Sequence, residues 1–293
     1  MESVSVVVPA YNESPAIVSV LEELGGELAR IGCPYEIIVV DDGSQDGTAA
    51  LAGARQDVTL LRHRENRGYG AALKTGIRHA SHSLICIIDA DGTYPVNALG
   101  DLVKHLDESN ADMVVGARTQ QRCDVPRGRR PAKWLIRQLA SFVTDETIPD
   151  LNSGFRVFRR DAALRMFSLL PSRFSFTTTI TLAMLTNGYL VGYIPIEYYS
   201  RVGNSKIKPV KDTLHFLELV LRIALYFAPL KVFLPASGFL MLLATAWAVY
   251  SKTVLGRLAD VSTLVIAMTA FQIAVIGMLA ELINRRLPNY YKG

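Results

Sequence analysis

The chain has 293 residues, 50% of them hydrophobic, and a formal net charge of only +4. That length allows one large domain or two small ones with an ample core. Cys33, Cys86 and Cys123 lie far apart, which argues against a disulfide framework or a cysteine metal site and suits a reducing compartment. Basic residues cluster over 118–130 and 201–211, next to hydrophobic segments, so we expect anionic lipid headgroups or phosphates as partners, and no nucleic acid.

Apolar residues are distributed unevenly along the chain. Through residues 1–200, short apolar runs alternate with charged and glycine-containing segments, whereas the C-terminal part is dominated by Leu, Ile, Val, Ala and Phe. This contrast predicts a soluble domain joined to a membrane part. Residues 1–10 open directly into a strand-like run without a basic leader, so we expect no signal peptide and a large domain in the cytosol.

The N-terminal half alternates strand-like and helix-like patterns. Such alternation predicts βαβ units and therefore an α/β fold with a mostly parallel sheet covered by helices on both faces. Strands buried on both faces are short, nearly continuous apolar runs, and the runs seen here have that form. We expect strands over 3–8, 35–40, 58–61, 84–88 and 112–115, and helices over 14–31 and from about 48.

The apolar run 84–88 stops abruptly at two carboxylates. Asp89 and Asp91 stand one residue apart, and Gly92 follows them. A hard cation such as Mg2+ or Mn2+ takes oxygen ligands, often one or two carboxylates with substrate phosphates completing the set. The pattern therefore predicts a site for a metal-bound diphosphate at a strand end. Ordinary turns also contain Asp-x-Asp-Gly, and these residues alone leave that alternative open.

Two further segments of this half concern a nucleotide. Asp41 and Asp42 follow the strand 35–40, where a base or ribose would be held. Residues 65–70 contain Gly-x-Gly before a helix, but Leu73 stands where a dinucleotide-binding motif has its third glycine. We therefore reject a nicotinamide or flavin site and expect these glycines to let a loop pack closely over the nucleotide.

The second half begins with a basic, irregular stretch over 118–131. A predicted amphipathic helix over 133–143 packs either on the sheet or on lipid. Residues 150–158 combine a carboxylate, a tight turn and a strand-like run. The loop Arg201–Lys206 contains two cations, a hydroxyl and a glycine, which fits either a phosphate site or a solvated basic turn. We further expect helices over 161–170 and 174–187 and a strand over 191–198.

From Pro209 the pattern predicts membrane elements. We expect a catalytic domain over 1–208, an interfacial amphipathic helix over 209–229, a transmembrane hairpin over 230–284 with spans 230–250 and 261–283, and a tail over 285–293. A hairpin buried in a protein core is the alternative. Basic residues flank the hairpin and outnumber those in its loop, which predicts a multi-pass protein of the cytoplasmic membrane with its catalytic domain in the cytoplasm. Gln272, in mid-span, needs a hydrogen-bonding partner in a neighbouring helix or another subunit, which would be a homo-oligomer.

Six motifs occur in an order that resembles a known family. They are VVVPAYNE (6–13), VVDDGSQDGT (39–48), NRGYGAAL (66–73), DADGTYP (89–95), DLNSGFRVF (150–158) and RVGNSK (201–206). Together they resemble family 2 glycosyltransferases with the GT-A (nucleotide-diphospho-sugar transferase) fold. The resemblance is to the polyprenyl-phosphate glycosyltransferases, related to dolichol-phosphate mannose synthase and to bacterial enzymes that glucosylate undecaprenyl phosphate. The Gln-x-x-Arg-Trp signature of processive synthases is absent from the sequence, which argues against a polymerase.

The resemblance implies roles for residues at matching positions. The implied nucleotide-binding residues are Pro9, Tyr11, Glu13, Asp42, Asp89 and Ala90. Asp89 and Asp91 would bind Mg2+ or Mn2+. The implied catalytic residues are Asp91, Asp150, Arg201 and Lys206, and the implied phosphate-binding residues are Arg118, Arg201, Ser205 and Lys206. Many relatives have Gln where this chain has Thr93, and the segment 174–180 lacks the acid that several family 2 enzymes carry there.

The resemblance also implies the reaction. A single sugar would pass, with inversion, from a UDP-sugar such as UDP-glucose, or from GDP-mannose, to undecaprenyl or dolichyl phosphate. A phosphate monoester has a second pKa of about 6, so the acceptor is largely dianionic in the cytosol and hardly needs a general base. Asp150 would then act as a base, a sugar-positioning group or a stabiliser of positive charge on the sugar. The alternatives are another lipid acceptor such as diacylglycerol, or an inert membrane scaffold for glycan export.

Overall fold

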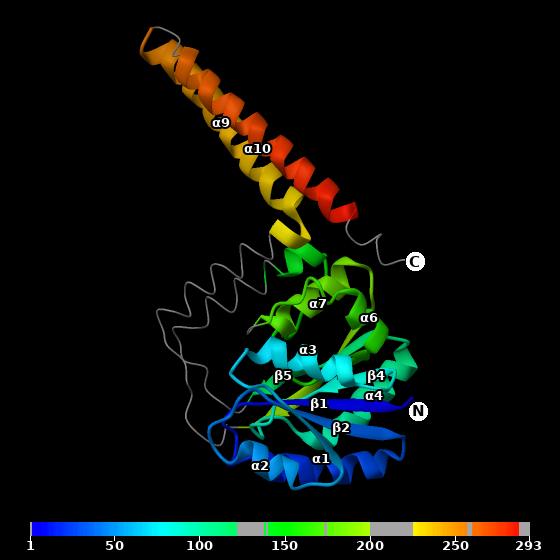
Figure 1. Cartoon of the computed structure of the whole chain (residues 1–293). Coiled ribbons are helices and arrows are strands. Elements are labelled where there is room, and N and C mark those ends of the chain that lie inside the picture. Colours follow the sequence, from blue (N-terminus) through cyan, green and yellow to red (C-terminus); the bar gives the residue numbers. More distant parts are fainter. Residues whose placement is uncertain are drawn as a thin grey trace. The chain divides into compact units, whose positions relative to one another are not determined.

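The structure is a computed structural model that describes residues 2–121, 138, 140–172, 175–199, 225–256 and 260–286. The chain separates into two compact units, Met1–Pro209 and Val210–Gly293. In its described residues the first unit is an α/β domain and the second is a pair of long helices (Figure 1).

One sheet forms the centre of the first unit. Its seven strands lie in the order β3-β2-β1-β4-β6-β5-β7. Strand β6 pairs antiparallel with β4 and β5, and the other pairings in the sheet are parallel, which confirms the prediction of a mostly parallel sheet. The strands are β1 (Val4–Ala10), β2 (Tyr35–Asp41), β3 (Val58–Arg62), β4 (Leu84–Ile87), β5 (Met113–Gln121), β6 (Arg156–Arg159) and β7 (Val191–Tyr198).

Helices cover both faces of this sheet (Figure 1). On one face, Val6 and Val8 of β1 share a core cluster with apolar residues of α1 and α4. On the other face α3 packs so closely that a Cβ at Gly76 would overlap Val7 and lie 3.2 Å from Cγ2 of Val40. The alternation of β1 side chains between the two faces explains why the whole strand is buried. The helices are α1 (Ile17–Ile31), α2 (Thr48–Gly53), α3 (Tyr69–His79), the 3-10 helix η1 (Val96–Ala98), α4 (Leu99–Ser109), α6 (Arg160–Arg165) and α7 (Phe176–Thr186).

In the first unit, three element ends differ from the predicted ones by three residues or more. Helix α1 begins at Ile17, later than predicted, because the Glu13 carbonyl accepts hydrogen bonds that close a turn before it. Strand β5 continues to Gln121 because β7 lies beside it and supplies backbone partners. Helix α6 ends at Arg165 because the next residues bond to carbonyls three positions earlier, which is turn geometry. The predicted helix over 133–143 lies mostly outside the described residues.

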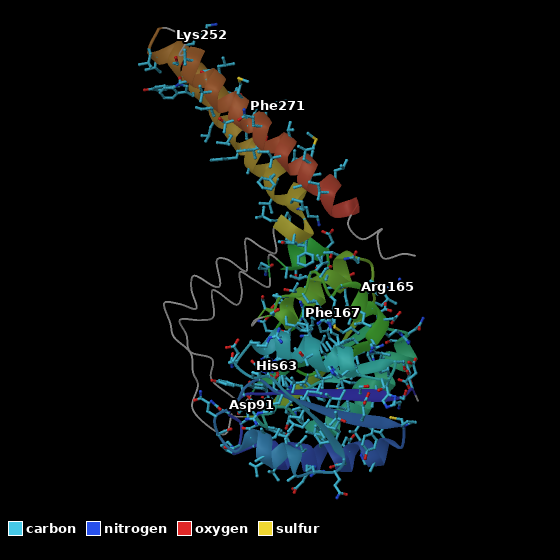
Figure 2. All side chains as sticks on the ribbon, viewed as in Figure 1. His63, Asp91, Arg165, Phe167, Lys252 and Phe271 are labelled. Carbon is cyan, nitrogen blue, oxygen red and sulfur yellow. The ribbon has the colours of Figure 1, made fainter. Side chains whose placement is uncertain are left out.

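The second unit contains α9 (Pro229–Val254) and α10 (Asp260–Arg286). The helices run antiparallel, with Ser237 Oγ donating to the Ala270 carbonyl at 2.7 Å. A Cβ at Gly277 would lie 2.6 Å from Cβ of Phe233, so a glycine is needed where the helices approach. Both helices are long and apolar enough to cross a membrane, and only 11% of the most apolar stretch of each helix is buried. Phe271 projects outward from α10 (Figure 2), as expected of an apolar helix that is surrounded by lipid and not by water.

Candidate active site

The described site residues gather along one edge of the sheet, the edge at which the parallel strands have their carboxyl ends. The chain passes from β1 outward to β2 and β3 and then returns to β4 on the other side of β1, so the strand order reverses between β1 and β4. In open α/β sheets ligands bind outside the carboxyl ends of the strands at such a reversal. Because β6 runs antiparallel, its first residue, Arg156, lies at the same edge, with Asp150 just before it in the chain. Figure 2 shows Asp91 and His63 at this edge.

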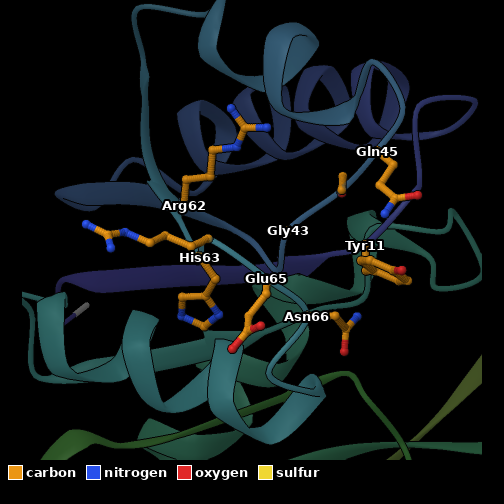
Figure 3. Close-up of a pocket in the computed structure, with 9 residues that line it drawn as sticks. Tyr11, Gly43, Gln45, Arg62, His63, Glu65 and Asn66 are labelled. Carbon is orange, nitrogen blue, oxygen red and sulfur yellow. The ribbon is translucent and has the colours of Figure 1, made fainter.

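A cavity of about 530 Å3 lies beside the loops that follow β1, β2 and β3 (Figure 3). Gly43 lines it with a φ of +76°, and a Cβ there would lie 2.7 Å from the backbone carbon of Glu65. The loops after β2 and β3 therefore pack backbone against backbone, and a glycine is required between them. The cavity is lined by Tyr11, Gly43, Ser44, Gln45, Arg62, His63, Arg64, Glu65 and Asn66.

Reciprocal hydrogen bonds join the loops after β1 and β2. Asn12, at a φ of +53°, donates its N–H to Ser44 Oγ at 2.9 Å, and its own Oδ1 accepts from the N–H of Gln45 at 2.8 Å. The N–H of Glu13 donates to Thr48 Oγ1 at 2.9 Å. These bonds fix the backbone at Asn12 and Glu13, directly after Tyr11, and Tyr11 and Glu13 are two of the predicted nucleotide-binding residues. Pro9 lies just before them in β1, beyond the last register pair with β4, where a missing N–H breaks no ladder bond.

The carboxylate of Asp42 is buried and already accepts from its own chain. Its Oδ1 lies 2.6 Å from Nδ1 of His63 and accepts from the N–H of Arg67 at 2.9 Å, and its Oδ2 accepts from the N–H of Gly68 at 2.8 Å. His63 Nε2 lies 2.9 Å from Oγ1 of Thr75 on α3. Asp42 therefore anchors the start of α3, and its predicted contact with the nucleotide stays a prediction.

Asp89 and Asp91 follow β4 and are half-buried. Asp89 Oδ1 accepts from the hydroxyl of Tyr69 at 2.8 Å, and burial together with the Asp89 charge raises the pKa of Tyr69 well above 10, so this phenol is a donor. Asp91 Oδ1 accepts from Oγ1 of Thr93 at 2.7 Å. Ala90, between them, is buried.

The donor set at this strand end fits a hard divalent cation. Asp89 and Asp91 offer carboxylate oxygens, and neighbouring hydroxyls support one oxygen of each. Among the described residues no three His, Cys, Asp or Glu side chains are grouped to hold a metal. A metal held here would therefore need oxygens from a substrate to complete its coordination, as Mg2+ commonly does with phosphates.

Arg118 of β5 and Asp150 form a bidentate ion pair. Nε of Arg118 donates to Oδ2 of Asp150 at 2.6 Å and Nη2 donates to Oδ1 at 2.9 Å, while the Arg118 N–H also reaches Oδ2. Burial raises the pKa of Asp150, but the hydrogen bonds and charge of Arg118 and the N–H of Asn152 outweigh it and hold that pKa below 3.8. Asp150 is therefore ionised at neutral pH and is a weak base.

Several residues of this edge were missed by sequence reasoning. Gly154 donates its N–H to the hydroxyl of Tyr94 at 2.7 Å, and a Cβ at Gly154 would overlap the Asp89 carboxylate. Arg156 is fully buried and donates to backbone carbonyls and a threonine hydroxyl. Tyr69, Tyr94, Gly154 and Arg156 all stand inside the six motifs, so the signal was present, but their contacts cross between motifs. Arg201, Ser205, Lys206 and nearly all of the predicted interfacial helix lie outside the described residues.

Comparisons with known proteins match both parts of the chain. The family model "Glycosyl transferase family 2" matches residues 5–167, and the model "GtrB C-terminal hairpin" matches residues 228–285. A dolichyl-phosphate beta-glucosyltransferase of Trichomonas vaginalis is 31% identical over 75% of this chain and 70% of its own length. A dolichyl-phosphate hexose transferase of Haloferax volcanii is 30% identical over 71% of this chain and 88% of its own.

Solved structures show the same fold at low identity. Glucosyl-3-phosphoglycerate synthase from Mycobacterium tuberculosis, crystallised with Mn2+, UDP and glucosyl-3-phosphoglycerate, superimposes with a TM-score of 0.57 at 19% identity and covers 76% of this chain and 79% of its own. Mannosyl-3-phosphoglycerate synthase from Rubrobacter xylanophilus gives 0.58 at 18% identity, over 76% of this chain and 72% of its own. These likenesses concern the fold alone, and they confirm the predicted GT-A architecture.

Proposed function

Because this chain belongs to glycosyltransferase family 2, we propose that it transfers a single sugar, with inversion, from a nucleoside-diphosphate sugar to a polyprenyl phosphate at the cytoplasmic face of a membrane. One observation carries the proposal. The relatives at 30–31% identity, which align over two thirds or more of both chains, are named for transfer to dolichyl phosphate. The likeness therefore extends beyond the donor-binding fold to proteins that share an acceptor.

The donor half of the reaction uses the cavity and the end of β4. Tyr11, with Pro9 and Glu13 beside it, would hold the base and ribose of a UDP-sugar or GDP-mannose in the cavity. Asp89 and Asp91 would hold Mg2+ or Mn2+, which when bound supplies positive charge to the leaving diphosphate. The Mn2+ in the M. tuberculosis structure supports a divalent ion in this fold.

The acceptor half needs cations more than it needs a base. A lipid phosphate monoester is largely dianionic near neutral pH, since its second pKa is about 6. Asp150, with its lowered pKa and its bidentate partner Arg118, is poorly suited to accept a proton. We propose that Asp150 orients Arg118 and faces the positive charge that develops on the sugar ring. Arg118, together with Arg201, Ser205 and Lys206, would neutralise the donor and acceptor phosphates.

The C-terminal hairpin would keep the enzyme at its lipid substrate. Helices α9 and α10 have the length and hydropathy to span a bilayer, with mean hydropathies of 1.9 and 2.1 over their most apolar windows. Basic residues before and after the hairpin outnumber those in its loop, which favours a cytoplasmic position for both ends. The catalytic unit would then meet cytosolic nucleotide sugars.

Membranes that contain the full chain test the proposal directly. They are incubated with radiolabelled UDP- and GDP-sugars, with undecaprenyl or dolichyl phosphate, and with Mn2+ or a chelator. We expect one donor to give a labelled, solvent-extractable glycolipid whose formation needs the metal and the polyprenyl phosphate. Label in a diacylglycerol product would identify another lipid acceptor. Absence of a glycolipid from every donor would support an inert scaffold.

A further inference from the structure

Tyr69 stands at the first position of α3, and its position is set from the β2 side of the site. Asp42 accepts hydrogen bonds from the N–H groups of Arg67 and Gly68, the two residues before Tyr69. Gly68 caps the helix at a φ of +102°, a conformation that L side chains rarely adopt. The Tyr69 hydroxyl then reaches across to Asp89 on the β4 side. The segment therefore connects the end of β2, beside the cavity, with the end of β4.

Asp89 is held from a second direction by the loop that contains Asp150. Gly154 lies so close to the Asp89 carboxylate that a methyl group on its Cα would collide with both carboxylate oxygens. Its N–H donates to the Tyr94 hydroxyl, and the Tyr94 ring packs edge-on against Tyr198 with centroids 5.3 Å apart. The Asp89 carboxylate thus lies close both to a hydroxyl donor and to a stretch of backbone that has no side chain.

We propose that Tyr69 is a positioning residue for the metal pair, and that Gly154 provides the space in which Asp89 can take that position. Neither residue is a metal ligand. Tyr69 orients the Asp89 carboxylate through the hydrogen bond from its hydroxyl, and Gly154, which has no side chain, leaves room beside the carboxylate. The inference rests on the proposed function, because it takes Asp89 as a ligand for Mg2+ or Mn2+. Groups that orient a ligating carboxylate typically contribute about 10- to 100-fold to metal affinity.

Mn2+ binding separates this role from simple packing. Tyr69→Phe keeps the ring and removes only the hydroxyl. Tyr193→Phe is a matched control, since the buried Tyr193 hydroxyl has no hydrogen-bonding partner in the described part of the chain. The full chain in detergent is titrated with Mn2+ at saturating UDP or GDP, and free Mn2+ is followed by electron paramagnetic resonance. We expect Tyr69→Phe to weaken Mn2+ binding about 10- to 100-fold and Tyr193→Phe to change it less than twofold.

A second pair of variants tests the space beside Asp89. Gly154→Ala should abolish measurable Mn2+ binding, whereas Gly26→Ala should leave it unchanged, because a Cβ at Gly26 meets nothing within 4 Å. If Gly154→Ala does not fold, Tyr69→Phe decides alone. Wild-type affinity in Tyr69→Phe would overturn the inference and leave the proposed function intact. A wild-type chain that binds neither Mn2+ nor Mg2+ with any nucleotide would overturn the metal role and this inference together.

Discussion

The ends of β2 and β4 carry the same sequence pattern, a buried apolar run followed by two acids. At β2, Asp41 and Asp42 are buried, with exposed fractions of 0% and 3%, and they accept from backbone N–H groups, Arg62 and His63. At β4, Asp89 and Asp91 are half-buried, and side-chain hydroxyls are among their donors. The first pair braces loops, whereas the second presents oxygens at the strand reversal. The sequence pattern is the same at both strand ends and does not distinguish the two roles. The role of each acid pair follows instead from its burial and from the groups that donate hydrogen bonds to it.

The largest expected effect is at the β4 end. Asp91→Asn removes the charge of a proposed metal ligand, and a metal that stabilises a leaving group contributes several kcal/mol to the transition state. We expect glycolipid formation to fall about 1000-fold or more at saturating donor, with little change in Tm. Initial rates with radiolabelled donor and a thermal unfolding scan measure the two quantities. A variant rate within tenfold of the wild-type rate would contradict the proposed role of Asp91 as a metal ligand.

A smaller loss of rate is expected at Asp150, whose loop approaches Asp89 through Gly154. Asp150→Asn keeps the shape but removes the charge, and we expect a rate loss of roughly 100-fold. Because the pKa of Asp150 lies below 3.8, the rate should depend on pH in the same way in variant and wild type between pH 5 and 9. Rate profiles over that range check this. If the wild-type rate changed with pH over part of this range and the variant's rate did not, Asp150 would titrate as a base.

The same pKa gives a stability prediction with a defined sign. The folded-state pKa of Asp150 is lowered, so its stabilising effect is present above about 4, the ordinary pKa of an Asp. That effect is lost as the pH falls through the lower folded-state value. Wild type and Asp150→Asn should therefore differ in Tm by the same amount from pH 5 to 8 and converge at lower pH.

The β2 end should respond in stability. Asp42→Asn leaves the donors of His63, Arg67 and Gly68 without the charged acceptor that is buried among them, which we expect to lower the free energy of unfolding by about 2–3 kcal/mol. Urea unfolding of the full chain in detergent measures the change. Asp57→Asn is the control, since its ion pair with Arg55 is exposed and should contribute less than about 1 kcal/mol. Equal losses for the two variants would contradict a bracing role for Asp42.

The sequence predicted the strands, the strand-end acids and the two long apolar helices because each depends on a local pattern. Burial on both faces makes a strand continuously apolar, and a chain that leaves the sheet at its edge can become polar there. The antiparallel position of β6 between β4 and β5 is set by packing partners far away in the sequence. Its four residues contain no sign of which strands they join.

The surroundings of the Arg156 side chain likewise depend on residues far away in the sequence, so the sequence did not predict them. A charged residue in a strand would be expected to face solvent, yet Arg156 is fully buried, as is its neighbour Phe155. The burial is tolerated because the guanidinium donates to the carbonyls of Ser153 and Thr177 and to Thr181 Oγ1. Those acceptors come from a turn and from α7, so the contact exists only after the chain has folded. The Arg118–Asp150 pair, which joins β5 to the next motif, was hidden for the same reason.

The smallest effect is expected at Asp46, in the loop that extends the β2 end. Its carboxylate accepts from the N–H groups of Ser14 and Thr48, and although burial raises its pKa, the hydrogen bonds from Thr48 and Ser14 lower it to about 2. Asp46 is exposed, so solvent weakens this contribution and Asp46→Asn should lower Tm only slightly at neutral pH. Because the folded-state pKa is the lower one, the difference should persist above about pH 4 and shrink as the pH falls toward 2. Tm measured for both proteins across that range checks the sign. If the difference in Tm grew as the pH fell, Asp46 would bind its proton more readily in the folded chain than in the unfolded one. The hydrogen bonds that its carboxylate accepts from Ser14 and Thr48 oppose this, so that result would contradict the prediction.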